Sequence, residues 1–212
     1  GPTGFGDDAE GGSGGWTLPG PDNLWHITTH RSRSGTRSWY CGLEGAWTYT
    51  RHARSLLVSP IFDSGLDAQL SFWAWYDVAL YGATGLYVEV SSGGGDWEKL
   101  DFIGSGGALN PLLMGNGWVQ YAYDLSRYGA AAPLQVRFRF VSDGEPVREG
   151  VYIDDVAVSS PGGAAALGFV RGDANGDGLV DIADALHTLG FLFAAGPETG
   201  CRDAADANDD GC

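Results

Sequence analysis

The chain has 212 residues, with 27 acidic residues against 12 lysines and arginines, and a formal net charge of −15. It contains one lysine and no basic patch, which disfavours nucleic-acid binding, because such binding displaces counterions from phosphates. No apolar run approaches the length of a membrane span, so we expect no membrane insertion. The length allows one substantial domain and one small module.

Residues 1–158 are predicted to form an all-β domain. Glycine is frequent, at 35 residues, and turn residues separate short apolar and aromatic runs, which favours a β-sandwich. These runs are SLLVSPIF, AQLSFWAWYDV, GLYVEVSSGGGDW, LQVRFRFVSD and GVYIDDVAVSS. In LQVRFRFV, Val136, Phe138 and Phe140 share one face of a strand, and Arg137 and Arg139 share the other.

Several motifs of this segment follow one another in a recognisable order. They are EGGSGGW, LLVSPIFD, LSFWAWYD, VEVSSGGGDWEKL, FRFVSDG and GVYIDDV. In this order they resemble the MAM-like jelly-roll module found beside bacterial secreted peptidases and in cell-surface proteins, although the cysteine pattern of the vertebrate form is absent. The resemblance implies a structural calcium shared by an early acidic residue and an Asp of the last strand. Here these would be Glu10 and Asp154, with Asp155 the weaker candidate.

The strand VYIDDVAV carries the two adjacent carboxylates. Strict alternation places Asp154 with Val156 and Val158 on the apolar face, where a carboxylate is costly unless it is paired or bound to a metal. The alternative is that Asp154 accepts hydrogen bonds at the edge of the sheet. Asp155 should point to the opposite face, so the pair cannot flank one scissile bond without a bulge. Because no HExxH or P-loop pattern occurs either, we predict that the chain is not an enzyme.

Two further stretches contain residues of types that occur in binding sites. His26 and His30 in WHITTH are four residues apart, and on a strand they would lie about 13 Å apart, too far for one zinc ion. In LSFWAWYDV, Trp73 and Trp75 share the face opposite to Phe72, Ala74 and Tyr76. The two tryptophans are candidates for sugar stacking or for a protein contact, unless loops cover both faces.

After a flexible linker at residues 159–168, the stretch DANGDGLVDIAD has the spacing of a calcium loop. Such a loop takes oxygen ligands from positions 1, 3, 5, 7, 9 and 12 and has glycine at position 6, which is Gly178 here. The predicted ligands are Asp173, Asn175, Asp177, Leu179 (through its carbonyl), Asp181 and Asp184.

The helix predicted after this loop has one apolar stripe. Ile182, Leu186, Leu189 and Phe193 follow at steps of four, three and four, and Gly196-Pro197 ends the helix. The loop and helix, RGDANGDGLVDIADALHTLGFLF, resemble the EF-hand-like calcium repeat of a type I dockerin, whose loops end in Asp. The resemblance implies a small α-helical association module over residues 169–212, which follows the jelly-roll domain and the linker.

A second, shorter copy of the loop carries Asp206, Asn208 and Asp210. As a half-loop it cannot surround a cation alone, so we expect it to need a partner, for example another copy of the chain. Cys201 and Cys212 flank it and could form a bridge. Cys41 would then be either a buried thiol or an intermolecular link.

The predicted calcium loops indicate an extracellular protein. Two functional hypotheses follow. The first is a non-catalytic structural or assembly protein, whose calcium-bound tail associates with a protein partner, including other copies of itself, into a polymer or filament. The second is a carbohydrate-binding accessory region of a secreted enzyme, with a glycan as its partner. The tail favours the first hypothesis.

Overall fold

The computed structural model describes residues 4–63, 65, 67–80, 82–104, 107–108, 114–128, 133–144, 146–159 and 182–194. Contacts divide the chain into two units, Gly1–Gly163 and Ala164–Cys212. The proposed linker, apart from Ser159, lies outside the described residues. Within those residues, no helix has the length and apolar character needed to cross a bilayer.

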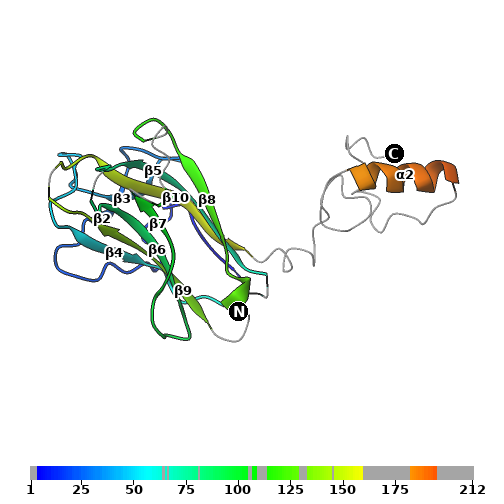
Figure 1. The fold of residues 1–212 in the computed structure, drawn as a ribbon, viewed down its shortest axis with the longest axis horizontal. Coiled ribbons are helices and arrows are strands. Elements are labelled where there is room, and N and C mark those ends of the chain that lie inside the picture. The colour runs from blue at the N-terminus through cyan, green and yellow to red at the C-terminus, as the bar shows by residue number, and fades with distance from the viewer. Residues whose placement is uncertain are drawn as a thin grey trace. The chain divides into compact units, whose positions relative to one another are not determined.

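The first unit is a β-sandwich of two antiparallel sheets (Figure 1). Its elements are β1 Phe5–Asp7, β2 Trp25–Thr28, β3 Ser38–Cys41, β4 Arg54–Val58, β5 Gln69–Asp77, β6 Gly85–Ser92, β7 Glu98–Gly104, β8 Val119–Asp124, the 3-10 helix η1 Ser126–Tyr128, β9 Leu134–Val141 and β10 Gly150–Ser159. The prediction of a mainly β-sandwich domain is confirmed.

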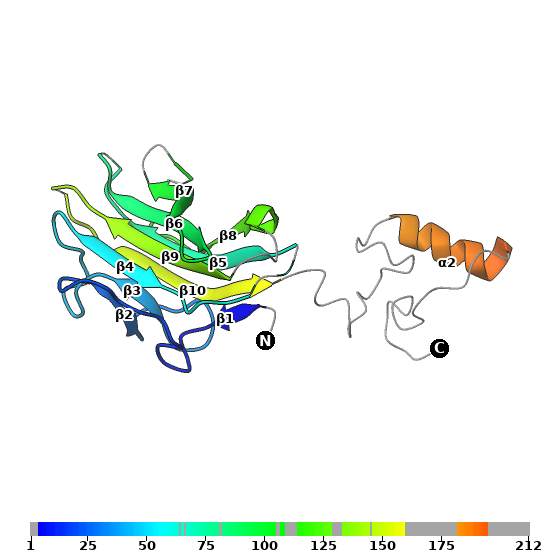
Figure 2. The ribbon, with the colours of Figure 1, turned by 90° about the horizontal axis from the view of Figure 1, so that it is seen from below.

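One sheet has six strands in the order β2-β3-β10-β5-β8, and β1 pairs with the second half of β10 (Figure 2). The other sheet has four strands in the order β4-β9-β6-β7. The longest strand, β10, is last in the sandwich and lies inside the six-stranded sheet, so it brings late residues next to the early strands β1 and β3.

The core lies between the sheets and follows the predicted alternation. Phe72, Ala74 and Tyr76 of β5 are fully buried, as are Val136, Phe138 and Phe140 of β9. Burying these apolar faces drives the two sheets together, at about 25 cal/mol for each Å² removed from water. The side chains between them on each strand consequently point outward, and they supply the candidate sites.

Cys41 lies in this core as a free thiol with no exposed surface. Burial raises the pKa of its thiol well above the usual value. This favours the prediction of a buried thiol over that of an intermolecular link. Cys201 and Cys212 lie outside the described residues.

The described part of the second unit is the helix α2, Ile182–Ala194. A helix is therefore present where the apolar stripe predicts one. Leu186, Leu189 and Phe193 are 62%, 51% and 81% exposed.

Candidate functional site

The outer face of the four-stranded sheet gathers charged and aromatic side chains. Tyr87 and Glu89 alternate with core residues on β6, and Arg137 and Arg139 do so on the neighbouring strand β9. Tyr87 pairs with Arg139 and Glu89 pairs with Arg137, so all four side chains stand on one face. We call this surface the arginine face; it also includes Arg54 of β4, Lys99 of β7 and Trp97 of the loop before β7.

Glu89 is the centre of this face. Its side chain is only 6% exposed, and it accepts the Nε–H of Arg137 at 2.6 Å. Arg139 donates from Nε and from Nη2, the latter at 2.7 Å to the other carboxylate oxygen. Burial raises the pKa of the Glu89 carboxyl, but the hydrogen bonds and charges of Arg139 and Arg137 outweigh burial and hold that pKa below its usual value. Glu89 therefore stays ionised and fixes both guanidinium groups.

Each of these arginines also lies over an aromatic ring. The guanidinium carbon of Arg137 is 4.3 Å from the ring centroid of Trp97, and that of Arg139 is 3.9 Å from the ring centroid of Tyr87. Phe102 of β7 lies against Tyr87 at 4.5 Å between ring centroids. Such cation–π contacts orient the guanidinium planes over the rings.

The arginine face borders a hollow of about 250 Å³. Tyr87, Arg139, Arg54, His52 and Asp143 line it with other residues. A second hollow of about 630 Å³ continues past His52 and Arg54 toward Asp22 and Asn23. Both hollows are lined by His52, Ala53 and Arg54, so they adjoin at the start of β4, and we call them together the groove.

The six-stranded sheet carries the aromatic residues that the sequence indicated as ligand-binding. Tyr40, Tyr152 and Trp75 stand side by side on β3, β10 and β5, with Tyr40 and Tyr152 stacked at 4.3 Å. Trp75 is 4% exposed, because the guanidinium of Arg31 lies 4.0 Å above its ring. Arg33 covers the half-buried Trp73 in the same way, at 4.3 Å.

Arg31 is itself held in place. Its Nε and Nη2 groups donate to the two carboxylate oxygens of Glu149 at 2.7 and 2.9 Å, and Tyr152 donates to the same carboxylate. Trp73 and Trp75 thus share an outward face, as predicted, but side chains of the β2–β3 loop cover both rings. Their role in ligand binding stays a prediction.

The placement predicted for Asp154 is wrong, because β10 has a bulge. Asp154 pairs with Trp73 and Ala157 pairs with Ser71, so β10 contains one extra residue here, and Asp155 has a positive φ of 49°. The bulge reverses the alternation. Asp154 therefore points outward with Tyr152, while Val156 and Val158 point into the core.

The bulge also brings both carboxylates to the β2–β3 loop. Asp154 accepts the backbone N–H of Arg33 at 2.7 Å and that of Ser34 at 3.3 Å, and Asp155 accepts the Ser34 hydroxyl at 2.5 Å. Burial raises the pKa of the Asp154 carboxyl to about 6, although these N–H groups act in the opposite direction. The expectation that the two neighbours face opposite sides therefore fails at this position.

Glu10 holds the other end of the same loop. It accepts the backbone N–H groups of Thr36 and Arg37, both at 2.6 Å, and the Thr36 hydroxyl at 2.9 Å. These hydrogen bonds, that of the Thr36 N–H foremost, lower the pKa of the exposed Glu10 carboxyl. Glu10 and Asp154 thus bind one loop from two sides.

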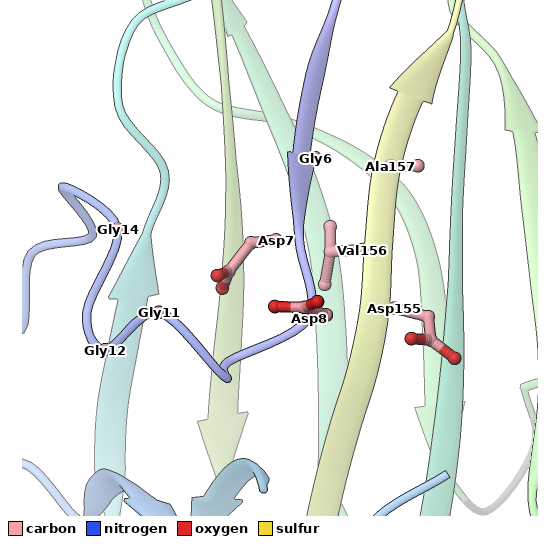
Figure 3. Close-up of a pocket in the computed structure, with 9 residues that line it drawn as sticks. All are labelled: Gly6, Asp7, Asp8, Gly11, Gly12, Gly14, Asp155, Val156 and Ala157. Atoms are coloured by element: carbon pink, nitrogen blue, oxygen red, sulfur yellow. The ribbon is translucent and has the colours of Figure 1, made fainter. Parts of the chain in front are cut away.

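The calcium site inferred for Glu10 and Asp154 stays a prediction. In the described part of the chain, no three His, Cys, Asp or Glu side chains gather closely enough to hold a metal ion. Asp155 also lines a hollow of about 440 Å³ with Asp7 and Asp8, but Figure 3 shows Asp7 and Asp155 pointing in different directions. Asp7 instead accepts the indole N–H of Trp39 at 2.8 Å.

The two histidines have different partners in the structure. His26 on β2 contacts Glu44 through Nε2 at 2.8 Å, whereas His30 stacks on Trp47 at 3.7 Å between ring centroids. Most of the predicted calcium-loop ligands lie outside the described residues: Asp173, Asn175, Asp177, Leu179, Asp181, Asp206, Asn208 and Asp210. Asp184 is described and lies buried in the first turn of α2.

The arginine face is not apparent as a site from the sequence alone, although part of its pattern is. Arg137 and Arg139 alternate with apolar residues, and GLYVEV carries the same outward alternation of Tyr87 and Glu89. What could not be seen was that these two strands, about 50 residues apart, are neighbours.

Comparison with known proteins agrees with the fold. No family model matches the chain. Bacillopeptidase F of Bacillus subtilis is 29% identical over 164 residues, which cover 74% of this chain and 11% of that protein's length. The chain therefore spans only about a tenth of this relative.

Two solved structures share the sandwich. The K1 cleaved adhesin domain of Lys-gingipain from Porphyromonas gingivalis W83 is 19% identical, with a TM-score of 0.50, over 75% of this chain and 99% of that domain. TmCBM61, solved in complex with β-1,4-galactotriose, is 12% identical with a TM-score of 0.50, over 72% of this chain and 94% of that one. At these identities the likeness concerns the fold alone.

Proposed function

We propose that the chain is a non-catalytic, glycan-binding region of an extracellular protein, and that its β-sandwich binds glycan through the arginine face. The observation that carries this proposal is the combination, on one outward sheet face, of Tyr87 and Trp97 with guanidinium groups that Glu89 fixes. Sugar sites combine aromatic rings, which pack against pyranose faces, with a few oriented polar groups, which bind hydroxyls.

The comparisons support this function over an assembly protein. The two solved structures with the same fold are an adhesin domain and a carbohydrate-binding module, and the curated relative is named as a peptidase of which the matching segment is a small part. By analogy, this chain would be an accessory region that attaches a secreted protein to a surface glycan. The analogy concerns fold and is a weaker support than the site itself.

The test is glycan binding by the whole chain, measured by calorimetry against a panel of polysaccharides that includes β-1,4-galactan and xylan. We expect Tyr87→Ala and Trp97→Ala to weaken binding about tenfold or more, as for aromatic anchors of a binding site. Trp73→Ala is the matched control on the opposite sheet. Loss of binding in the Trp73 variant alone would move the site to the six-stranded sheet, and no binding to any glycan would refute the function.

A second candidate function, calcium-dependent association through the C-terminal unit, is supported by the surface of α2. Leu186, Leu189 and Phe193 form one stripe along the helix, and each is more than half exposed. Exposed apolar stripes are typical of protein contacts. Light scattering in chelator and then in millimolar calcium tests this function, because growth in molar mass on adding calcium would support self-association, whereas constant mass would exclude it.

A further inference from the structure

We infer that the ligand of the arginine face is an anionic glycan whose charge is carried by carboxylates, such as a uronic-acid polysaccharide. This inference rests on the proposed function and specifies the chemical class of its ligand. It is carried by the distribution of charge over the sandwich, by the hydrogen-bond donors that remain unused on this face, and by the groove beside them.

The outer face of the four-stranded sheet carries more basic than acidic side chains, although the sandwich as a whole is acidic. Ten of the chain's lysines and arginines and 18 of its acids precede residue 171, so this part of the chain is acidic. Four of these ten bases nevertheless occupy outward positions of the four-stranded sheet, namely Arg54, Lys99, Arg137 and Arg139. Within the described strands of this sheet, Glu89 is the one acid at an outward position, and it forms ion pairs with both Arg137 and Arg139. The face therefore holds a surplus of positive charge in an acidic protein.

Several of its donors are unused. Arg137 reaches Glu89 through Nε, and its terminal nitrogens make no hydrogen bond within the described residues. Arg54 is exposed and has no ion pair or side-chain hydrogen bond within the described residues, and the same holds for Lys99. A guanidinium presents its N–H groups in a planar fork that matches a carboxylate, which makes arginine the preferred partner for such groups.

The arrangement suits a polymer. Arg137 and Arg139 are two residues apart on β9, about 7 Å along the strand, and Arg54 continues the row on the neighbouring strand beside the groove. Asp143, which also lines the groove, is engaged by the backbone N–H of Ala83 at 2.6 Å. A chain with repeating carboxylates can thus meet successive cations, while Tyr87 and Trp97 provide surface for its sugar rings.

The experiment compares two forms of one ligand on the whole chain. Oligogalacturonate carries a carboxylate on each sugar, and its methyl ester has the same rings without charge. Calorimetry at fixed ionic strength should show at least tenfold tighter binding of the acid form. Arg54→Ala should weaken binding of the acid form about tenfold, the loss of about one hydrogen bond to a charged group, and should weaken binding of the ester by less.

The test needs variants that leave the fold intact. Arg139→Ala would leave the buried Glu89 with one partner and could destabilise the sheet, so Arg54→Ala and Lys99→Ala, both exposed, provide the test. Arg33→Ala on the opposite sheet removes the same charge and controls for long-range electrostatics.

Four results would overturn the inference. Equal affinity for acid and ester would do so while leaving the proposed glycan binding intact. Equal weakening by Arg33→Ala and Arg54→Ala would show only a general charge effect. Binding of neutral galactan or xylan with no binding of oligogalacturonate or of alginate oligosaccharides would refute the carboxylate class, and failure of every glycan would refute the proposed function as well.

Discussion

The guanidinium carbon of Arg31 lies 4.0 Å from the ring centroid of Trp75 on the outer face of the six-stranded sheet. This contact decides what the aromatic cluster of that sheet can do, because it leaves Trp75 only 4% exposed. A sugar that stacked on this indole would have to displace an arginine that makes two hydrogen bonds to Glu149. On the arginine face, Arg137 and Arg139 lie over Trp97 and Tyr87 at similar distances, but there the proposed ligand would bind the guanidinium groups and would not have to displace them.

Glu149→Gln should uncover Trp75. Burial raises the pKa of the Glu149 carboxyl, but Arg31 and Tyr152 outweigh burial and lower that pKa, so the wild-type group is charged at neutral pH and holds Arg31. The neutral amide loses the charge-assisted pair, and we expect about 1–2 kcal/mol lower stability. Acrylamide quenching of tryptophan fluorescence should increase. The same substitution in a Trp75→Phe background is the control, and an equal increase there would contradict the assignment to Trp75.

The ion pair between Glu149 and Arg31 should also make the stability of the fold depend on pH. A carboxyl whose folded-state pKa is lowered contributes stability that is present above its ordinary pKa of 4.5 and is lost as the pH falls through the folded value. The difference in unfolding free energy between wild type and Glu149→Gln should therefore shrink below about pH 4.5. Urea unfolding at pH 3.5, 5 and 7 measures it, and a difference that grew on acidification would contradict this sign.

Glu89→Gln should lower the free energy of unfolding more than Glu98→Gln does. Glu89 is buried between Arg137 and Arg139, and an amide would turn an N–H₂ group toward one of these donors. We expect a loss of about 2–3 kcal/mol, as for one partner removed from a buried ion pair. Glu98→Gln is the control, because the Glu98–Arg127 pair is more than half exposed on both sides and such surface pairs contribute about 0–1 kcal/mol. Equal losses in urea unfolding would contradict the central role of Glu89.

Asp154→Asn should remove a pH dependence of stability whose sign is opposite to that expected for Glu149. Burial raises the pKa of Asp154 to about 6, so the folded state favours the protonated form. The stability from this group is present below the ordinary pKa of 3.8 and is lost as the pH rises through about 6. Relative to the Asn variant, wild type should lose about 2–3 kcal/mol between pH 4 and pH 7. Urea unfolding in calcium-free buffer tests this, and parallel pH profiles of the two proteins would contradict it.

Gly150→Ala should destabilise the start of β10. Gly150 has a positive φ of 118°, and an added Cβ would lie 2.5 Å from the carbonyl oxygen of Cys41 on β3. Backbone strain and the clash together should cost about 2–4 kcal/mol. Gly12→Ala is the matched control, with a positive φ of 90° and no atom within 4 Å of the added Cβ, and it should cost about 1 kcal/mol. Similar melting temperatures for both variants would contradict the close approach of β3 and β10.

Alternation along the chain was sufficient to predict the sandwich and the two faces of β5 and β9. Phe72, Ala74 and Tyr76 are buried as expected, and so are the inward residues of β9, because side chains on a strand point alternately to its two faces whatever their partners are. The helix α2 was predicted by the spacing of Leu186, Leu189 and Phe193 for the same kind of local reason. These features depend on the backbone period, which local sequence specifies.

Pairing between distant segments could not be inferred in this way. One extra residue at Asp155 reversed the phase of β10 and moved Asp154 to the outer face, and alternation alone contains no sign of such a bulge. The partners of Glu89 lie 48 and 50 residues further along the chain, and Arg31 reaches Glu149 across 118 residues. Tertiary structure decided these contacts because they depend on which strands become neighbours. They in turn decide that Arg31 covers Trp75 and that Glu89 fixes the guanidinium groups of Arg137 and Arg139.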